Sequence, residues 1–350
     1  MVEKNNKFDS ERHLMKDLDN KFLINTKNYI EKELGFCKEL TDGAKCILLG
    51  FPTYINIGDL LIWMGEINFL KKYLNAKKIL QANIYNGCIN VLEKCIFNKD
   101  IIFLQGGGNW GDLWYEHQKY REDIITRFKD NKIIVFPQTI YYRNKEKLIK
   151  SGEIINAHSN LTILVRDKVS EVLAKEYYYN ADIVLCPDMA FYFDLPKVKS
   201  KKNKNKMLFL CRRDKENAQI YSIYFDKDIY DIVDWIDILP LITLVLSRLS
   251  SALGSFWGRM TKLKIHYTVA IILYKISSFF FILKAWILIY KAIKIVKMYR
   301  HIVSSRMHGH ILATMLRIDN TLLPNAYYKN EEFYRCWTVD DPISNFDQCV

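Results

Sequence analysis

Two side chains that can do chemistry stand close together near the end of the chain. Arg306 and His308 lie in the segment SSRMHGH, between a strand-like run and an apolar run with helical periodicity. Residues two apart in an extended turn point the same way, so a guanidinium that binds anions lies beside an imidazole that titrates near neutral pH. The N-terminus of the following helix favours negative charge at the same place. The pair therefore predicts a site for an anionic ligand, and His310 is taken as a structural residue.

A glycine-rich segment predicts a second part of this site. GGGNWGDLW (106–114) follows a strand-like run and matches neither a dinucleotide-binding nor a Walker motif. Its glycines let backbone amides approach a phosphate or carboxylate closely, and the alternative is a tight turn that needs positive φ. The earlier segment NIGD (56–59) is similar to NWGD, and helix capping is the alternative for its Asn and Asp. The candidates for substrate contact are Gly106, Gly107, Gly108, Asn109, Asp112, Asn56 and Asp59.

Two arginines also follow strand-like runs. Arg166 directly follows LTILV and can bind a carboxylate or phosphate through two parallel hydrogen bonds. The alternative is an ion pair with Asp167 or Glu171. Arg212 follows MLFLC and is either an anion ligand or a linker charge. Both arginines add to the prediction of an anionic substrate.

Two further candidates have two interpretations each. Asp188 in CPDMAF is a base or a helix cap. His117, just after the glycine-rich segment, reaches the cleft or lies on the exposed surface. The histidines are otherwise scattered, with no HxxxH spacing, so no metal site is predicted.

The elements that must position these residues alternate between strands and helices. Strand-like runs at 46–50, 78–84, 101–105, 132–136, 161–165 and 182–185 each end in a glycine-rich or polar turn. This alternation is typical of a parallel, doubly wound sheet with its site at the strand ends. After a run rich in Lys and Asn (195–206) the pattern restarts with another strand. We therefore predict an α/β fold with two Rossmann-like doubly wound domains that face a cleft. The predicted parts are a helical leader (1–44), a first domain (45–196) and a second domain (197–350).

The composition is that of a globular protein. Half of the 350 residues are hydrophobic and 26% are charged, which excludes a disordered chain. None of the eight cysteines forms a CxxC pair, so we expect buried thiols in a reducing compartment. The polar start of the chain has no apolar h-region, so we predict no signal peptide and a cytoplasmic location.

The net charge of +12 is concentrated in one apolar stretch, because residues 238–300 hold ten basic residues and no acidic one. Lys284, Lys291 and Lys294 fall near one face of a helix, which favours a peripheral contact with an anionic membrane surface. Two alternatives stay open, an amphipathic helix packed on the core and a membrane span within 266–300. Nucleic acid is not expected as a partner, because the cations alternate with Ile and Leu.

Six segments together resemble one protein family. In chain order they are GDLLIW, GGGNWGDLW, FPQTIYY, VRDKVS, CPDMAF and SSRMHGHIL, and they resemble the polysaccharide pyruvyl transferase family over residues 46–335. The resemblance implies a two-domain fold of the GT-B-like kind. It also implies transfer of a pyruvyl group from phosphoenolpyruvate onto a saccharide of a surface polysaccharide precursor, as a pyruvate ketal, without a metal or an organic cofactor.

The resemblance also implies roles for particular residues. His308 would be the general acid and base, and Arg306 and Arg166 would hold the anionic groups of the donor. Gln138, in the Pro-Gln-Thr element, joins the substrate-binding candidates. A lipid-linked acceptor at the inner membrane face would explain the basic, apolar stretch.

The chain departs from the family pattern at two places. Ser305 stands where the family usually has an acidic residue. The run Pro324–Tyr328 replaces most of an Asp-Asn-Ser-Tyr-Gly-Lys-like segment. Two alternative functions therefore stay open, a glycosyltransferase that uses a nucleotide sugar and a non-catalytic, membrane-associated scaffold of polysaccharide assembly.

Overall fold

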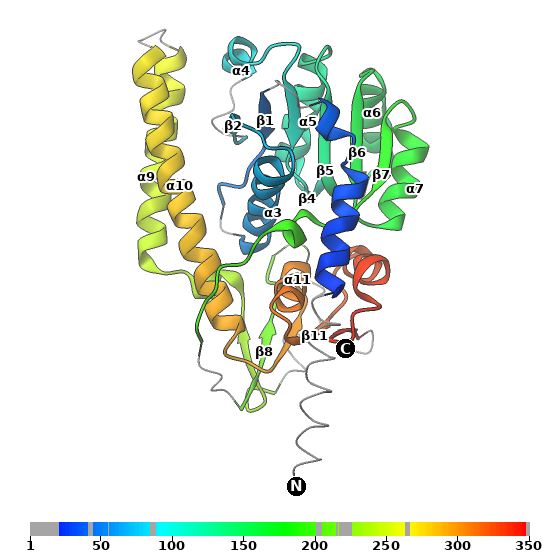
Figure 1. Cartoon of the computed structure of the whole chain (residues 1–350), viewed down its shortest axis with the longest axis vertical. Helices are drawn as coiled ribbons and strands as arrows, with labels where there is room; N and C mark the ends of the chain where they lie inside the picture. The colour runs from blue at the N-terminus through cyan, green and yellow to red at the C-terminus, as the bar shows by residue number, and fades with distance from the viewer. Residues whose placement is uncertain are drawn as a thin grey trace.

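The computed structural model contains two parallel β-sheets, one above the other, with helices on their faces (Figure 1). It describes residues 21–40, 45–54, 56–84, 89–200, 205–214, 216, 226–262 and 267–347. Residues 21–33 and α2 (Cys37–Leu40) are helical, and the rest of the predicted leader, 1–20 and 41–44, lies outside the described residues. The fold is thus α/β, as predicted, and the predicted boundary between 196 and 197 stays a prediction.

The first sheet has seven strands in the order β2-β1-β3-β5-β6-β7, with β4 paired to β5 beyond the end of β3. Because the chain adds strands on both sides of β1, the order reverses between β1 and β3, and ligands bind at such a switch point. The strands are β1 (Cys46–Leu49), β2 (Ile79–Ala82), β3 (Ile101–Leu104), β4 (Gly107–Gly111), β5 (Ile133–Tyr141), β6 (Leu161–Val165) and β7 (Asp182–Leu185). All four residues of β1 and of β3 are buried, as expected for a parallel sheet covered on both faces.

The second sheet is also parallel and also has a point where the strand order reverses. Its five strands have the order β12-β11-β10-β8-β9. Its switch point lies between β8 and β10, the strands that precede the second group of predicted site residues. The strands are β8 (Met207–Leu210), β9 (Tyr230–Val233), β10 (His301–Ser304), β11 (Asp319–Leu322) and β12 (Ser344–Phe346).

Helices connect the strands of each sheet. In the first half they are α3 (Ile57–Asn68), its π-helical continuation η1 (Phe69–Tyr73), α4 (Ile89–Cys95), α5 (Tyr115–Arg127), α6 (Lys145–Asn156) and α7 (Lys168–Tyr177), followed by the short η2 (Met189–Tyr192). In the second half they are η3 (Trp235–Ile238), α9 (Leu241–Lys262), α10 (Tyr267–Val296), α11 (Met307–Met315), α12 (Lys329–Phe333) and η4 (Tyr334–Thr338).

The glycine-rich segment departs from the expected turn. Residues Gly107–Gly111 form β4, a strand that continues the edge of β5 where β3 ends. Gly111 has φ +127°, and a Cβ there would overlap the carbonyl of Tyr141. The alternative of a tight turn is therefore wrong as to the turn, because pairing with β5 keeps the segment extended, but the positive φ that it required is present at Gly107 and Gly111. Only glycine fits so close to that strand.

One apolar core runs through both halves of the molecule. It includes Leu48 and Phe103 of the first sheet, Leu210 and Ile302 of the second, and Leu288 of α10. Although α10 follows the strands of the second half, it packs against α3 of the first half. The long hairpin of α9 and α10 (Figure 1) therefore ties the two halves together.

The expected basic face of α10 needs correction at one lysine. Lys284 is only 1% exposed, and its Nζ donates to the carbonyl of Thr53 at 2.9 Å, while Lys294 is exposed. Nζ of Lys284 also lies over the ring of Phe281, 5.0 Å from its centroid. Within the part of the chain that the structure describes, no helix combines the length and hydropathy needed to cross a bilayer.

Candidate active site

A cavity of about 750 Å³ lies where the carboxyl ends of the two sheets meet. The loops after β1 and β4 line it from the first sheet, and those after β8 and β10 line it from the second. These are the positions at which two switch points place ligands. The predicted site residues that line the cavity are Asn56, Asp59, Gly108, Asn109, Asp112, His117, Arg212, Arg306 and His308.

His308, Asp188 and Arg166 form a buried chain of polar contacts at this site. Nε2 of His308 lies 3.3 Å from Oδ2 of Asp188, and Nη1 of Arg166 pairs with the same oxygen. Nε of Arg166 also donates to the hydroxyl of Thr139 at 2.9 Å. Burial alone would raise the pKa of Asp188, but the charges of His308 and Arg166 hold it well below its usual range. Asp188 is therefore a carboxylate that orients the other two side chains.

These contacts decide two alternatives that the sequence left open. Asp188 accepts the backbone amide of Ala190 at 2.8 Å, so it caps η2 as well as pairing with His308. The ion pairs suggested for Arg166 with Asp167 or Glu171 are wrong. Asp167 instead caps α7, and Glu171 binds exposed lysines. Only the folded chain brings the carboxylate after β7 to the arginine after β6.

The first turn of α3 lies against the ring of His308. A Cβ added to Gly58 would lie 2.5 Å from Nδ1 of His308, so a glycine is needed for α3 and α11 to approach here. Asn56 caps α3 by accepting the amide of Gly58 at 3.0 Å, and its Nδ2 donates to Asp59 at 2.8 Å. Asn56 and Asp59 are thus partners at a helix start, and both also line the cavity.

Gly108 makes room for two cations. A Cβ on Gly108 would overlap Nζ of Lys329 and lie 2.9 Å from Nη2 of Arg166. That Nη2 is buried and has no hydrogen-bond partner among the described residues. Lys329 was not predicted as a site residue, although it ends the segment that corresponds to the family's Asp-Asn-Ser-Tyr-Gly-Lys-like run. Its position at the end of that run was the signal that could have found it.

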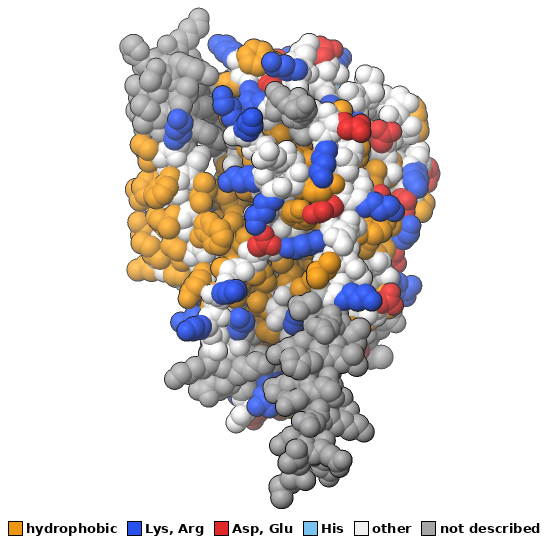
Figure 2. Space-filling view, in the orientation of Figure 1, with side chains coloured by type: hydrophobic (Ala, Val, Ile, Leu, Met, Phe, Trp, Pro, Cys, Tyr) orange, Lys and Arg blue, Asp and Glu red, His pale blue; other side chains and the backbone are white. Residues whose placement is uncertain are grey.

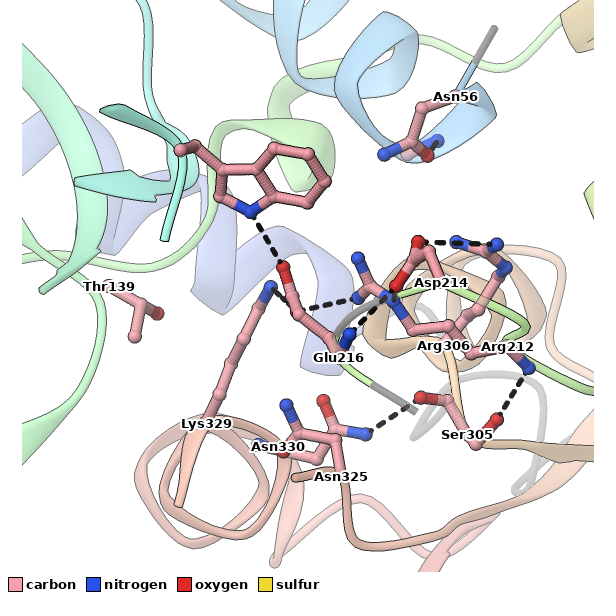
Figure 3. A network of polar contacts seen from close by, with 12 residues as sticks. Asn56, Thr139, Arg212, Asp214, Glu216, Ser305, Arg306, Asn325, Lys329 and Asn330 are labelled. Carbon is pink, nitrogen blue, oxygen red and sulfur yellow. Dashed lines mark hydrogen bonds and ion pairs between the residues drawn. The ribbon is translucent and has the colours of Figure 1, made fainter. Parts of the chain in front are cut away.

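A buried glutamate holds the cations of the second sheet in place (Figure 3). Oε2 of Glu216 lies 2.9 Å from Nζ of Lys329 and 2.7 Å from Nη1 of Arg212, and Oε1 accepts the indole N–H of Trp114 at 3.2 Å. Burial would raise the pKa of Glu216, but Lys329 and Arg212 lower it to about 2. Arg212 is therefore a member of the site and not a linker charge.

Arg306 reaches the cavity with its orientation fixed by an aspartate. Nε and Nη2 of Arg306 donate to the two carboxylate oxygens of Asp234, at 2.5 and 2.8 Å. Asp214 lies 3.7 Å from Nη2 of the same guanidinium. Neither aspartate was predicted, because each stands in a loop whose sequence shows only an ordinary polar turn.

The remaining cavity residues of the first sheet are held by their own partners. Oδ1 of Asn109 accepts Nη2 of Arg121 at 2.7 Å, and Nδ2 lies 3.5 Å from Nδ1 of His117. The ring of His117 packs edge-on to that of Tyr54, so the exposed-surface alternative is wrong. Asp112 accepts backbone amides at the start of α6, which makes it a structural residue at the rim.

Other predicted residues lie behind the cavity lining. The amide of Gly106 donates to Oε1 of Glu66 at 2.7 Å, and Nε2 of Gln138 donates to the carbonyl of Gln105 at 2.7 Å. Gly107 takes φ +129°, which leads the chain into β4. Gly106 and Gln138 thus support the glycine-rich strand from behind the lining, and the amide of Gly106, paired with Glu66, does not contribute to the predicted amide cradle. Arg166 and Asp188 also lie beneath the lining, but in contact with Gly108 and His308 respectively.

The two departures from the family pattern have structural explanations. Oγ of Ser305 accepts the amide of Arg212 at 2.8 Å, which joins the loops after β8 and β10 (Figure 3). In the run Pro324–Tyr328, the ring of Tyr327 stacks on that of Tyr141, with centroids 4.1 Å apart. Ser305 thus joins two loops of the site, and Tyr327 links its run to the end of β5.

The fold and the cavity together define the class of protein. Two doubly wound sheets place their switch points at one cavity, and that cavity holds arginines, a lysine and a histidine beside buried carboxylates. This is an α/β protein built to hold a ligand between two sheets.

Comparison with known proteins identifies the family. Residues 56–326 match the sequence profile of the polysaccharide pyruvyl transferase family, so the chain belongs to this family and is a transferase. It is 28% identical over 319 residues to "Putative pyruvyl transferase EpsO" of Bacillus subtilis, across 91% of this chain and 93% of that protein. It is 28% identical over 211 residues to "Pyruvyl transferase 1" of Schizosaccharomyces pombe, across 55% and 52% of the two chains.

A solved structure shares the fold. A functionally uncharacterised protein of Klebsiella pneumoniae superimposes with a TM-score of 0.56 at 19% identity, over 93% of this chain and 99% of that one. At this identity the similarity concerns the architecture alone.

Proposed function

We propose that the protein transfers a pyruvyl group from phosphoenolpyruvate to a saccharide and forms a pyruvate ketal. The observation that carries the proposal is the convergence of Arg166 Nη2 and Lys329 Nζ at Gly108. Because Nη2 is buried without a partner among the described residues, an anionic oxygen would supply the acceptor that it lacks. Phosphoenolpyruvate brings two such groups, a carboxylate and a phosphate.

The reaction requires a proton at the methylene carbon of the donor and a nucleophile at C2. In this proposal His308 gives the proton to the methylene carbon, and the first sugar hydroxyl attacks the oxocarbenium-like centre at C2. The bond from C2 to the phosphate oxygen then breaks, phosphate leaves with the electron pair, and a second hydroxyl closes the ketal. The two sugar hydroxyls release two protons. One restores the proton that His308 gave to the methylene carbon, and the other leaves with phosphate.

In this proposal, different cationic side chains bind the two anionic groups of the donor. Lys329 holds the anionic donor near His308, with Arg166 adding its positive charge from beneath Gly108, and Arg306 and Arg212 bind the second anionic group from the side of the second sheet. Asp188 keeps Arg166 and His308 oriented. The proposal assigns no metal and no organic cofactor, because these side chains meet the negative charges of the donor.

The acceptor would enter through the open side of the cavity. Asn56, Asp59, Asn109 and His117 line it and offer the amide, carboxylate and imidazole groups that bind sugar hydroxyls. We take the arrangement to be GT-B-like, with two Rossmann-like domains and the saccharide between them. We also propose that the saccharide is a lipid-linked precursor, modified at the cytoplasmic face of a membrane.

Thermal unfolding with ligands tests the donor. A ligand that binds only the folded state at a hundredfold excess over its Kd adds about 2.7 kcal/mol of stability. We expect phosphoenolpyruvate to raise the Tm of the wild type, and this rise to be lost in Arg166→Met. Lys119→Met serves as the matched control, because Lys119 is exposed and its ammonium group pairs with the exposed Asp123. Release of inorganic phosphate on addition of an acceptor saccharide then tests the transfer.

Two outcomes would contradict the proposal. A rise in Tm with nucleotide sugars and none with phosphoenolpyruvate would indicate a glycosyltransferase on the same fold. Full cellular function of an Arg306→Ala, His308→Ala double variant, together with no response to any of these ligands, would indicate a scaffold.

A further inference from the structure

An apolar stripe runs along the outer face of α10. Large hydrophobic side chains recur there at spacings of three and four residues, each between 39% and 60% exposed. They are Ile276, Phe279, Leu283, Trp286 and Tyr290. At 1.5 Å per residue the stripe is about 21 Å long. A continuous stripe of this kind differs from the single apolar residues that scatter over ordinary protein surfaces.

The neighbouring helix enlarges this surface. On α9, Leu241, Ile242, Val245 and Leu249 are between 43% and 77% exposed. Figure 2 shows hydrophobic side chains gathered over α9 and α10, at the left of the molecule. We call these four residues and the stripe of α10 the hairpin patch.

The opposite face of α10 packs against the rest of the protein. The ring of Phe281 lies 4.9 Å from that of Phe51, and Nζ of Lys284 donates to the carbonyl of Thr53. Ser277 of α10 donates to the carbonyl of Ser250 on α9 at 2.8 Å. These contacts hold α10 to the first half and α9 to α10. Because this other face of α10 is the packed one, the hairpin patch faces outward.

The charges on the hairpin itself have one sign. Residues 238–300 contain no acidic side chain, and Arg248, Lys275 and Lys294 are exposed. Lys291 and Lys294 also line an open groove of about 710 Å³ next to Trp286 and Tyr290. Cations beside aromatic and aliphatic side chains are typical of a helix that lies in the headgroup region of an anionic bilayer.

We propose that the hairpin patch docks on the surface of an anionic lipid bilayer, with Lys291 and Lys294 at the lipid phosphates. A second copy of the chain fits the patch poorly, because two hairpins without acidic residues would bring like charges together. The inference deepens the membrane location in the proposed function, but it requires neither pyruvyl transfer nor its substrates.

Vesicle flotation of the full chain tests this surface. The probes are vesicles of phosphatidylcholine alone and of phosphatidylcholine with phosphatidylglycerol. We expect binding to the mixed vesicles, weakened by added salt and by Lys291→Glu with Lys294→Glu about tenfold or more. We expect Phe279→Ser with Trp286→Ser to weaken binding by a similar factor, because less apolar surface inserts.

Matched controls separate the patch from general effects. Tyr179→Ser changes a 72% exposed aromatic residue outside the hairpin, and Lys129→Glu changes an exposed lysine outside it. Both should bind vesicles as the wild type does. If phosphoenolpyruvate raises the Tm of each patch variant as much as it raises the Tm of the wild type, the fold and the cavity of the variant are intact.

Three results would overturn the inference. They are no flotation with anionic vesicles, equal binding by the wild type and both patch variants, and a dimer in sedimentation that Phe279→Ser dissociates. A failed vesicle test with an intact response to phosphoenolpyruvate would reject the surface and leave the proposed function standing.

Discussion

Gly58 and His308 lie so close that a Cβ on Gly58 would fall 2.5 Å from Nδ1 of the imidazole. Gly58 belongs to the first turn of α3, and His308 belongs to the first turn of α11. The start of one helix from each half thus meets at the group proposed to move a proton. This contact makes the position of His308 depend on a residue that has no side chain.

Replacing Gly58 should therefore disturb catalysis without unfolding the protein. Alanine is a good helix former, so Gly58→Ala should keep α3 but displace the ring of His308. We expect pyruvyl transfer to fall by about a hundredfold, in the range that general acid–base groups contribute. A double-mutant cycle checks this, because Gly58→Ala should cause no further loss in a His308→Ala background. Additive losses would place the effect elsewhere.

Lys329 should contribute to the affinity for the donor. Lys329→Met keeps much of the buried stem but removes the charge at Gly108, so the Kd for phosphoenolpyruvate should rise about tenfold to a hundredfold. Calorimetric titration measures this directly, with Lys119→Met as a control for the loss of a lysine. An unchanged Kd would exclude Lys329 from the donor site.

Asp188 should act as a positioning residue through its two partners. Asp188→Asn keeps the size of the side chain but removes the charge that orients Arg166 and His308. We expect kcat to fall by about a hundredfold, with the Tm still raised by phosphoenolpyruvate, because Arg166 and Lys329 both keep their positive charges beside Gly108. Steady-state rates and melts on the same sample separate the two effects. A variant with normal kcat would show that the carboxylate only caps η2.

The buried amine of Lys284 should make stability depend on alkaline pH. Burial lowers its pKa from 10.5 to about 8, so between these values the unfolded chain binds the proton and the folded chain does not. Stability from this group therefore rises as pH increases from about 8 to 10.5, by about 3 kcal/mol in total. Denaturant unfolding of the wild type and Lys284→Met across this range measures the difference. A constant difference between the two proteins would mean that the amine titrates normally.

The sequence alone determined the architecture to a large extent. The strands at LTILV and DIVL were predicted at the residues where they occur, because short apolar runs between polar turns signal buried strands locally. The order of strand, turn and helix then placed the candidate residues at strand ends, where a parallel sheet binds ligands. The glycine-rich segment escaped this reasoning, since pairing of β4 with β5 depends on where β3 ends.

Only the tertiary structure decided which of these residues meet. Asp188 could have been a base or a cap, and its pairing with Arg166 and His308 follows from the packing of η2 beside α11. Lys329 and Glu216 came to the site unpredicted, and Lys284 turned inward although its spacing suggested a basic face. Sequence spacing reports which way a side chain points on its own element. The neighbour it meets, and hence its burial and its charge, depends on how distant elements pack.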